Sequence, residues 1–231
     1  MFGAYDAEGN REYNAAVFLA PEAAHEVAFD TYRKTTLFPF TERVPSWLDG
    51  PRLRRALPWL GSWTPGAGVS TITLELADGR RIPVAPLICY DAVDPRNAAR
   101  AVRAGAALIV TLSNDSWLAG GAGAWLHFVV SVFRSIETGR PQVRATTTGI
   151  SALITGTGEV VATAGVHERT GLVGRVVPVA TPPPLTVRFG EWLGPLGALV
   201  ASAGLVGRRG GAQQGGPVVS SSRAIAKKRP T

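Results

Sequence analysis

The sequence contains one cysteine, Cys89, among 231 residues. A single cysteine excludes an intramolecular disulfide framework and a zinc site built from several cysteines. Free cysteine is among the most buried residue types and usually acts as a small apolar side chain. Cys89 is therefore either core packing or a reactive thiol, and the residues around it must decide between the two.

Lysine is almost as rare. Residues 1–206 contain 17 arginines and one lysine, Lys34. A lysine in a pocket can lose or donate a proton when its pKa is lowered, whereas an arginine cannot. Lys34 is either a surface lysine that persists by chance or one kept for chemistry. Because Glu42 follows it in the proline-bounded loop 37–45, Cys89, Lys34 and Glu42 together would supply a nucleophile, an acid and a base.

Acidic residues are missing from the C-terminal part. From Gly207 onward the chain has six basic residues and no acidic residue, whereas residues 1–206 carry 18 basic and 17 acidic residues, a net charge of +1. Residues 207–231 are rich in glycine, serine and glutamine, which predicts a basic disordered tail. Such a tail can bind an anionic membrane or nucleic acid. Because no aromatic residue is interleaved with its charges, a nucleic-acid partner is not expected.

Long apolar runs are also scarce. Residues 192–206 form an uncharged run of 15 residues. A helix of that length covers about 22 Å, less than the hydrocarbon core of about 30 Å, which favours a buried or interfacial helix. Trp192 at one end and the basic tail at the other instead match the aromatic-anchor and positive-inside pattern. The run is therefore a candidate transmembrane segment after a linker at 181–191. If it spans, the tail is cytoplasmic and residues 1–190 lie on the opposite side.

The chain opens without a cleavable signal peptide, because residues 1–14 are polar and contain acids. An exported domain would need a targeting segment before it. We therefore expect that upstream sequence is missing.

The middle of the chain alternates between strand-like and helix-like stretches, which predicts a mixed α/β layered fold with one domain over residues 1–180. Asp94 is a helix N-cap followed by a proline at the first helical position, and Asp78-Gly79 marks a hairpin turn. The expected strands are 13–20, 26–33, a pair within 71–89, 107–113, 142–147, 151–156, 159–165 and 172–179, and the expected helices are 95–103 and 124–138.

Cys89 stands at the end of an apolar strand, where the chain turns toward the helix that begins at Pro95. Strand-to-helix turns of this kind display nucleophiles, and nearby helix amides favour a thiolate or an oxyanion. Histidine is the usual helper of a catalytic cysteine. Of the three histidines, His127 lies on a predicted helix after a glycine-rich loop, but no sequence feature pairs it with Cys89.

Five motifs resemble the carbon–nitrogen hydrolase (nitrilase) superfamily, and within it the apolipoprotein N-acyltransferases. They are YRKTTLFPFTERVP, LICYD, GAALIVTLSNDSW, RSIETGRPQVRATTTGISALITGTGEVV and VRFGEW. The resemblance implies a nitrilase-like α-β-β-α sandwich, here incomplete at the N-terminus, and a Glu-Lys-Cys triad. By motif, Cys89 would be the nucleophile, Lys34 would stabilise the tetrahedral intermediate and Glu42 would assist. The supporting or substrate-binding residues would be Tyr90, Asp91, Trp117 and His127.

The same resemblance implies the chemistry and the setting. A phospholipid would donate a fatty acyl group to the cysteine as a thioester. The amine of a diacylglyceryl-cysteine at a lipoprotein N-terminus would then accept it. The expected place is the bacterial inner membrane, with the catalytic domain on its outer face. No cofactor and no metal are expected.

The sequence departs from the family pattern at several positions. The family's general base is a glutamate in a PE-x-A motif well upstream of the lysine. Glu22 in APEAA mimics that motif but falls in the predicted hairpin turn, so we expect the base to be absent. Thr147, Leu126 and Thr41 stand where Asn, Gln and Gly are usual. Two alternatives stay open: an amide hydrolase that uses the same cysteine and lysine, and a non-catalytic remnant that acts as a binding module.

Overall fold

The computed structural model describes residues 1–21, 27–118, 121–190 and 192–211. It divides into two compact units, Met1–Gly190 and Glu191–Thr231, and each is described here by itself. Glu22, which mimics the general-base motif, lies outside the described residues, as does the tail beyond Gly211.

The first unit begins with a three-stranded antiparallel sheet in the order β1-β2-β3. Its strands are β1 (Phe2–Glu8), β2 (Arg11–Pro21) and β3 (Val27–Arg33). The β2–β3 pairing confirms the predicted hairpin. β1 was not predicted because its sequence is polar. Its acids form ion pairs on one face of the sheet, where Asp6 and Glu8 bind Arg33 at 2.7 and 2.9 Å.

The second sheet has six strands in the order β4-β5-β6-β7-β8-β9, of which β5, β6 and β7 run parallel. Sequence patterning predicted each of these strands. Their bounds are β4 (Ile72–Glu75), β5 (Arg81–Ile88), β6 (Leu108–Ser113), β7 (Gln142–Thr146), β8 (Ser151–Ile154) and β9 (Val160–Ala164).

The helices of the first unit are α1 (Pro51–Ala56), the 3-10 helix η2 (Cys89–Ala92), α2 (Pro95–Arg103), α3 (Gly121–Thr138) and α4 (Leu185–Phe189). Asp94 caps α2 as predicted, because its side chain accepts a hydrogen bond from the Arg96 amide at 3.0 Å. The predicted helix at 124–138 is confirmed and begins three residues earlier, at Gly121.

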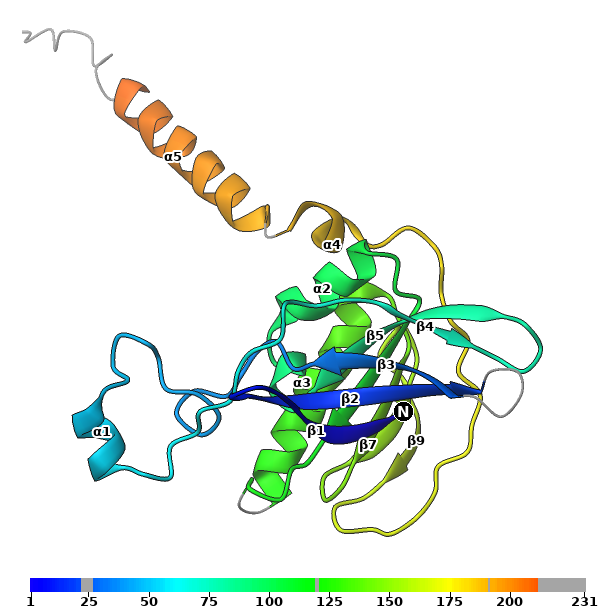
Figure 1. Ribbon diagram of the computed structural model, residues 1–231. Helices are drawn as coiled ribbons and strands as arrows, with labels where there is room; N and C mark the ends of the chain where they lie inside the picture. Colours follow the sequence, from blue (N-terminus) through cyan, green and yellow to red (C-terminus); the bar gives the residue numbers. More distant parts are fainter. Residues whose placement is uncertain (22–26, 119–120, 191, 212–231) are drawn as a thin grey trace, which may run out of the picture. The chain divides into compact units, whose positions relative to one another are not determined.

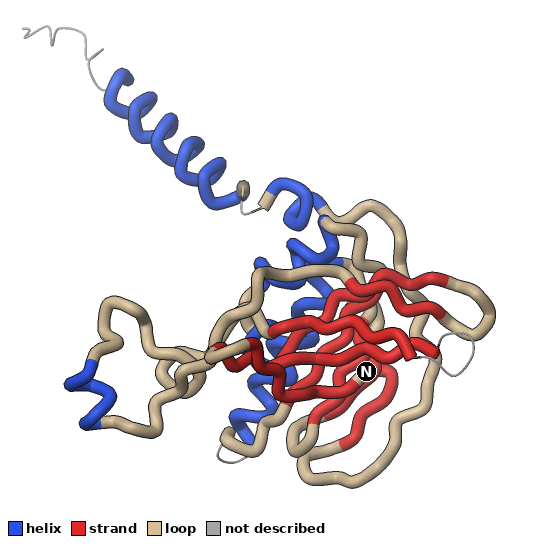
Figure 2. The backbone as a smooth tube through the Cα atoms, viewed as in Figure 1, coloured by secondary structure: helices blue, strands red, loops and turns tan. Residues whose placement is uncertain are grey.

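The first unit is layered, and strand periodicity explains how (Figure 1, Figure 2). Side chains alternate between the faces of a strand. Val84 and Ile88 on β5 pack against Phe18 of the three-stranded sheet. Ala85 and Leu87 lie between them in the strand and pack on the helical side, with residues of α2. β5 is therefore buried on both faces, between the smaller sheet and the helices.

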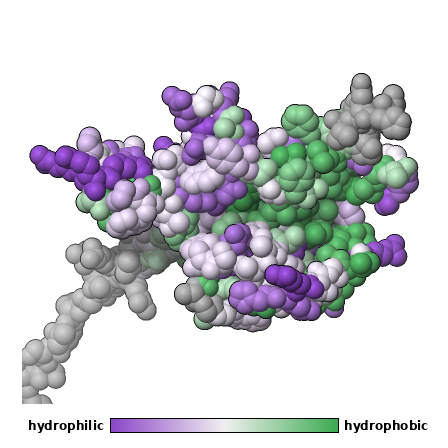
Figure 3. All heavy atoms as spheres, turned by 60° about the horizontal axis from the view of Figure 1, so that its bottom comes forward, coloured by the Kyte–Doolittle hydropathy of each residue, from purple (hydrophilic) through white to green (hydrophobic). Residues whose placement is uncertain are grey.

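The outer face of the three-stranded sheet is exposed and partly apolar. Leu19 and Phe29 pair across β2 and β3 and are 52% and 70% exposed. Figure 3 shows hydrophobic surface gathered in the right-hand half of its view. Within the described residues no helix packs closely on β1, β2 or β3.

Residues 172–179 were predicted as a strand, and that prediction is wrong. They form no ladder of hydrogen bonds with the sheet, although the Val179 amide donates to the Ala107 carbonyl at 2.9 Å. Pro178 has no N–H to donate, and Gly174 contributes no side chain to a sheet face.

The second unit is described through helix α5 (Leu193–Gly211). None of the helices in the described residues is long and apolar enough to cross a membrane. The transmembrane segment expected at 192–206 is therefore not confirmed. Glycine and alanine make up much of this run, and both are less hydrophobic than the leucine and valine between them.

Candidate active site

Cys89 lies directly after β5, at the carboxyl ends of the parallel strands, and opens the 3-10 helix η2. Its φ angle is 49°, in the left-handed region that residues with a Cβ rarely adopt. A backbone of this kind costs about 1–3 kcal/mol and clusters at functional sites. The strained residue stands where the apolar strand β5 ends and the chain turns directly into η2. Cys89 therefore lies on a sharp strand-to-helix turn of the kind that displays nucleophiles.

Lys34 follows β3, and its side chain is only 1% exposed. Its ammonium Nζ donates to both oxygens of Glu42, at 2.7 Å to Oε1 and 2.6 Å to Oε2. Glu42 also accepts from the Phe38 amide at 2.6 Å, which fixes the loop between them. A buried ammonium that is paired and hydrogen-bonded in this way is held in one place.

Asp91 is fully buried beneath the elbow. One carboxylate oxygen accepts from the amides of Thr35 and Thr36 at 3.2 and 2.6 Å. The other accepts from the Ile88 amide at 3.1 Å and the Tyr32 hydroxyl at 2.9 Å. Burial raises the pKa of Asp91, while these donors act to lower it. The carboxylate joins the turn that carries Cys89 to the segment that carries Lys34.

A pocket of about 540 Å³ opens above these side chains. Phe38 forms part of its wall and makes edge contacts with Trp117 and with Tyr90, both at 4.8 Å between ring centroids. Trp117 is 45% exposed. The pocket is therefore open to solvent on an aromatic side. Its lining residues are Gly3, Asn14, Lys34, Phe38, Thr41, Glu42, Ile88, Cys89, Leu112, Ser113, Asn114, Trp117, Ala145, Thr146 and Thr147.

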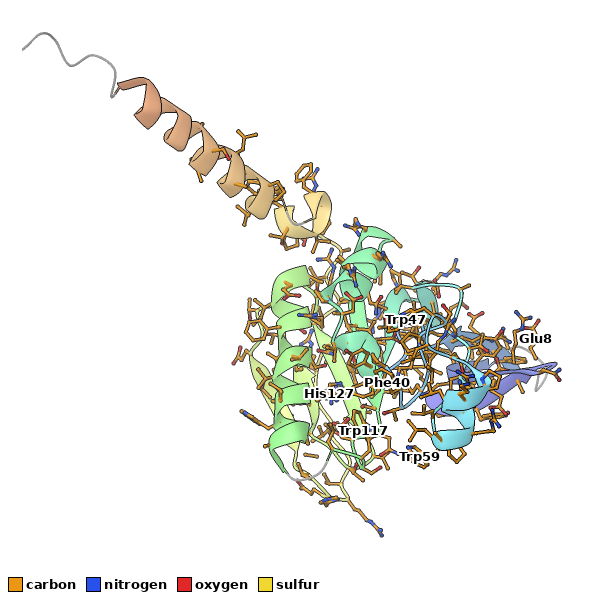
Figure 4. The ribbon with its side chains drawn as sticks, turned by 90° about the vertical axis from the view of Figure 1, so that its left-hand side faces the viewer. Glu8, Phe40, Trp47, Trp59, Trp117 and His127 are labelled. Carbon is orange, nitrogen blue, oxygen red and sulfur yellow. The ribbon has the colours of Figure 1, made fainter. Side chains whose placement is uncertain are left out.

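A buried polar network supports the elbow from the helical side. His127 lies on α3 (Figure 4). Its Nε2 is 3.2 Å from the Cys89 carbonyl and its Nδ1 is 2.9 Å from Asp115. Asp115 also accepts from Ser113 Oγ at 2.6 Å and from Arg144 at 3.0 Å. The main chain of the cysteine is thus connected to a fully buried ion pair.

The thiol of Cys89 is neutral at rest. Burial raises its pKa above the ordinary 9.0, and the charges of Asp115 and Glu42 act in the same direction. Lys34 and a hydrogen bond with Ser113 act to lower the pKa but do not offset burial. The cysteine therefore needs a base before it can attack.

Cys89, Asp115 and His127 also present three ligand-type atoms within 4.8 Å of one another. This cluster does not fit a metal cation. Asp115 already accepts hydrogen bonds from Ser113, His127 and Arg144, and Arg144 brings a buried positive charge to the same carboxylate. A second cation there would be repelled, so we regard the cluster as a hydrogen-bond network.

The structure brings the predicted Cys89, Lys34, Glu42 and Trp117 to one pocket. The other three predicted residues lie around it: Tyr90 packs on Phe38, while Asp91 and His127 are buried beneath the elbow.

Sequence reasoning missed three residues of the site, Ser113, Asp115 and Arg144. Two signals were available. Asp115 follows an apolar strand within the SNDSW motif, and Arg144 is a charged residue inside a predicted strand.

Comparisons with known proteins agree with this architecture. Residues 1–180 match the carbon-nitrogen hydrolase family. The chain is 32% identical over 211 residues to the apolipoprotein N-acyltransferase of Methylococcus capsulatus, a match covering 88% of this chain and 37% of that protein. It is 27% identical over 190 residues to apolipoprotein N-acyltransferase 2 of Treponema denticola, a match covering 80% of this chain and 35% of that protein.

The solved structures support the fold. The carbon-nitrogen hydrolase from Helicobacter pylori G27 superimposes with a TM-score of 0.51 at 17% identity, covering 72% of this chain and 57% of that chain. The Nesterenkonia amidase superimposes with a TM-score of 0.50 at 20% identity, covering the same 72% of this chain and 57% of its own. The chain spans little more than a third of the length of the two curated relatives. By its family match over residues 1–180, the chain belongs to the carbon–nitrogen hydrolases.

Proposed function

We propose that this chain carries the acyl-transfer site of an apolipoprotein N-acyltransferase-like protein, with Cys89 as the nucleophile. The observation that carries the proposal is the convergence of a strained elbow cysteine, the Lys34–Glu42 pair and an open aromatic pocket. Similarity to apolipoprotein N-acyltransferases over most of the chain supports acyl transfer over the other chemistries of the family.

The first half-reaction forms a thioester. The Cys89 thiolate attacks the ester carbonyl of an acyl donor, and the tetrahedral oxyanion is stabilised by the Lys34 ammonium. The intermediate collapses by breaking the ester C–O bond, and the lysophospholipid alcohol leaves with a proton. The acyl group then remains on sulfur.

The second half-reaction restores the enzyme. An uncharged α-amine attacks the thioester carbonyl, the C–S bond breaks, and an amide and the free cysteine result. A thioester suits this order of events because it reacts with amines more readily than with water. Glu42 holds the Lys34 side chain in place through both steps.

The proton of the Cys89 thiol needs an acceptor. Glu42 is the one carboxylate among the described residues that line the pocket, and both of its oxygens bind Lys34. We propose that a general base outside the described residues takes the proton, as the family's glutamate does in the motif resemblance.

The proposed substrates are a phospholipid acyl donor and the N-terminal diacylglyceryl-cysteine of a lipoprotein, and the proposed place is the outer face of the bacterial inner membrane. Three observations support this proposal: the similarity to proteins named apolipoprotein N-acyltransferases, the apolar helix α5 and the open pocket at Cys89.

The test supplies bilayers with phospholipid and a diacylglyceryl-cysteine peptide, and follows N-acylation of the peptide by mass spectrometry. A parallel assay supplies small amides and follows ammonia release. Activity on the peptide that is lost in Cys89→Ala supports the proposal. Turnover of amides alone would favour an amide hydrolase.

A further inference from the structure

A second cleft lies away from Cys89 and is lined by three arginines. It has a volume of about 540 Å³ and is formed by the end of α2, the residue after Gly139, the segment 180–183 and α4. α4 packs beside α2, where Val187 joins the same core cluster as Val102 (Figure 1). The arginines are Arg103, Arg140 and Arg188, and no acidic residue is among the described residues that line the cleft.

Arg140 is the most deeply placed of the three, at 3% exposure. Its guanidinium donates only to backbone carbonyls, at 3.0 Å to Ala106 and 2.5 Å to Thr181, with longer contacts to Thr138 and Gly139. Burial lowers its pKa, and no carboxylate among the described residues that line the cleft offsets this effect. The guanidinium N–H groups therefore have hydrogen-bond acceptors, but the positive charge has no carboxylate partner among the described residues.

The other two guanidiniums face the cleft with most of their donors unused. Arg103 donates once, to the Val187 carbonyl at 2.9 Å. Arg188 lies over the Phe189 ring, 5.5 Å from its centroid. Within the described residues none of the three arginines forms an ion pair, whereas Arg33, Arg54 and Arg144 each bind a carboxylate.

Helix ends account for part of this charge. The C-termini of α2 and α3 both lie at the cleft, and each carries about half a negative charge. Two such ends offset about one of the three positive charges, so about two remain without a counter-charge. Planar guanidiniums with free N–H groups match the oxygens of a phosphate.

We propose that this cleft binds a phosphate group, carried either by a lipid headgroup or by a free phosphate. α5 starts at Leu193, only five residues after Arg188 in the chain. Because α5 is largely apolar and follows so soon in the chain, we favour a lipid headgroup as the source of the phosphate. The inference stands apart from the acyl-transfer proposal, because it uses neither Cys89 nor the pocket around it.

The test uses the full chain and two pairs of substitutions. Arg103→Gln with Arg188→Gln removes two charges from the cleft. Arg11→Gln with Arg169→Gln removes two exposed charges elsewhere and serves as the control. Because Arg103 also holds the Val187 carbonyl, Arg188→Glu alone is a second variant that breaks no hydrogen bond. Thermal unfolding checks that each protein folds.

Binding is measured by co-sedimentation with phosphatidylcholine vesicles, with and without phosphatidylglycerol, and by calorimetric titration with inorganic phosphate. We expect the cleft variants to lose about 30-fold in affinity for the phosphatidylglycerol vesicles, about 2 kcal/mol, and the control to lose far less. Saturable binding of inorganic phosphate that the cleft variants abolish would identify free phosphate as the ligand. Equal losses in cleft and control variants, or unchanged binding in both arms, would overturn the proposal.

Discussion

The Asp91 carboxylate lies 2.6 Å from the Thr36 amide, and this contact ties the cysteine turn to the segment that carries Lys34. The same side chain holds the Ile88 amide, one residue before Cys89. The nucleophile and the lysine come from different sheets, so their separation depends on a buried group that touches both segments. Asp91 is that group, and it lies outside the pocket.

Replacing Asp91 with alanine removes four hydrogen bonds and leaves buried amides without an acceptor. We expect the free energy of unfolding to fall by about 3 kcal/mol. Asp94→Ala, which removes the cap of α2 and an ion pair with Arg96, is the matched control, with an expected loss of about 1 kcal/mol. Urea unfolding measures both, and similar losses in the two variants would argue against a joining role for Asp91.

The reactivity of Cys89 should depend on two neighbouring charges of opposite sign. Because burial raises the thiol pKa, alkylation by iodoacetamide should reach half its maximal rate above pH 9.0. Lys34→Met removes a charge that lowers this pKa and should move the midpoint higher. Glu42→Gln removes a charge that raises it and should move the midpoint lower. A midpoint below 9.0, or shifts of the same sign, would contradict the electrostatics described for the pocket.

His127 holds the backbone of the elbow, so its loss should affect Cys89 without removing a pocket wall. We expect His127→Ala to lower the free energy of unfolding by about 2 kcal/mol and to slow labelling of Cys89 by an acylating probe about tenfold. Leu126→Ala, at the 64% exposed neighbouring position on α3, is the control and should change neither. Loss of stability with full labelling would show that His127 does not position the cysteine.

Asp115 should make the protein sensitive to acid. Burial acts to raise its pKa, but hydrogen bonds from His127 and Ser113 and the charge of Arg144 outweigh it, so the pKa of the folded protein is lowered. A lowered pKa contributes stability that is present above the unfolded value of about 4 and is lost as the pH falls below it. Asp115→Asn should therefore be less stable than the parent at about pH 7, with a smaller difference below about pH 4. A difference that does not shrink on acidification would contradict this sign.

Arg144→Met tests the other half of the same ion pair. It leaves the Asp115 carboxylate buried without its cation, which should cost about 3–5 kcal/mol. The double variant with Asp115→Asn should recover part of that loss, because it also removes the unpaired charge. Additive losses in a double-mutant cycle would mean that the two groups are not coupled.

The sequence was sufficient to predict the site residues that lie in short motifs. Cys89 and Lys34 stood out by rarity and by their place after predicted strands, and the structure brings them to one pocket. The Asp115–Arg144 pair could not be predicted, because 29 residues separate its members and patterning gives no distances. β1 was missed because its acids, which bind Arg33, interrupt the apolar pattern that is expected of a strand. Residues 172–179 show the reverse case. Val176 packs against the core, but Val173 and Val177 are 97% and 62% exposed, and the stretch pairs with no described strand.

The central claim is that Cys89 takes an acyl group onto its sulfur. The most direct measurement is intact-protein mass spectrometry after incubation with a p-nitrophenyl fatty ester, whose leaving group needs no proton, at a pH above the raised thiol pKa. We predict one acyl adduct per chain that is located on Cys89, removed by neutral hydroxylamine and absent in Cys89→Ala. An unmodified parent protein, or an equal adduct on Cys89→Ala, would contradict the account.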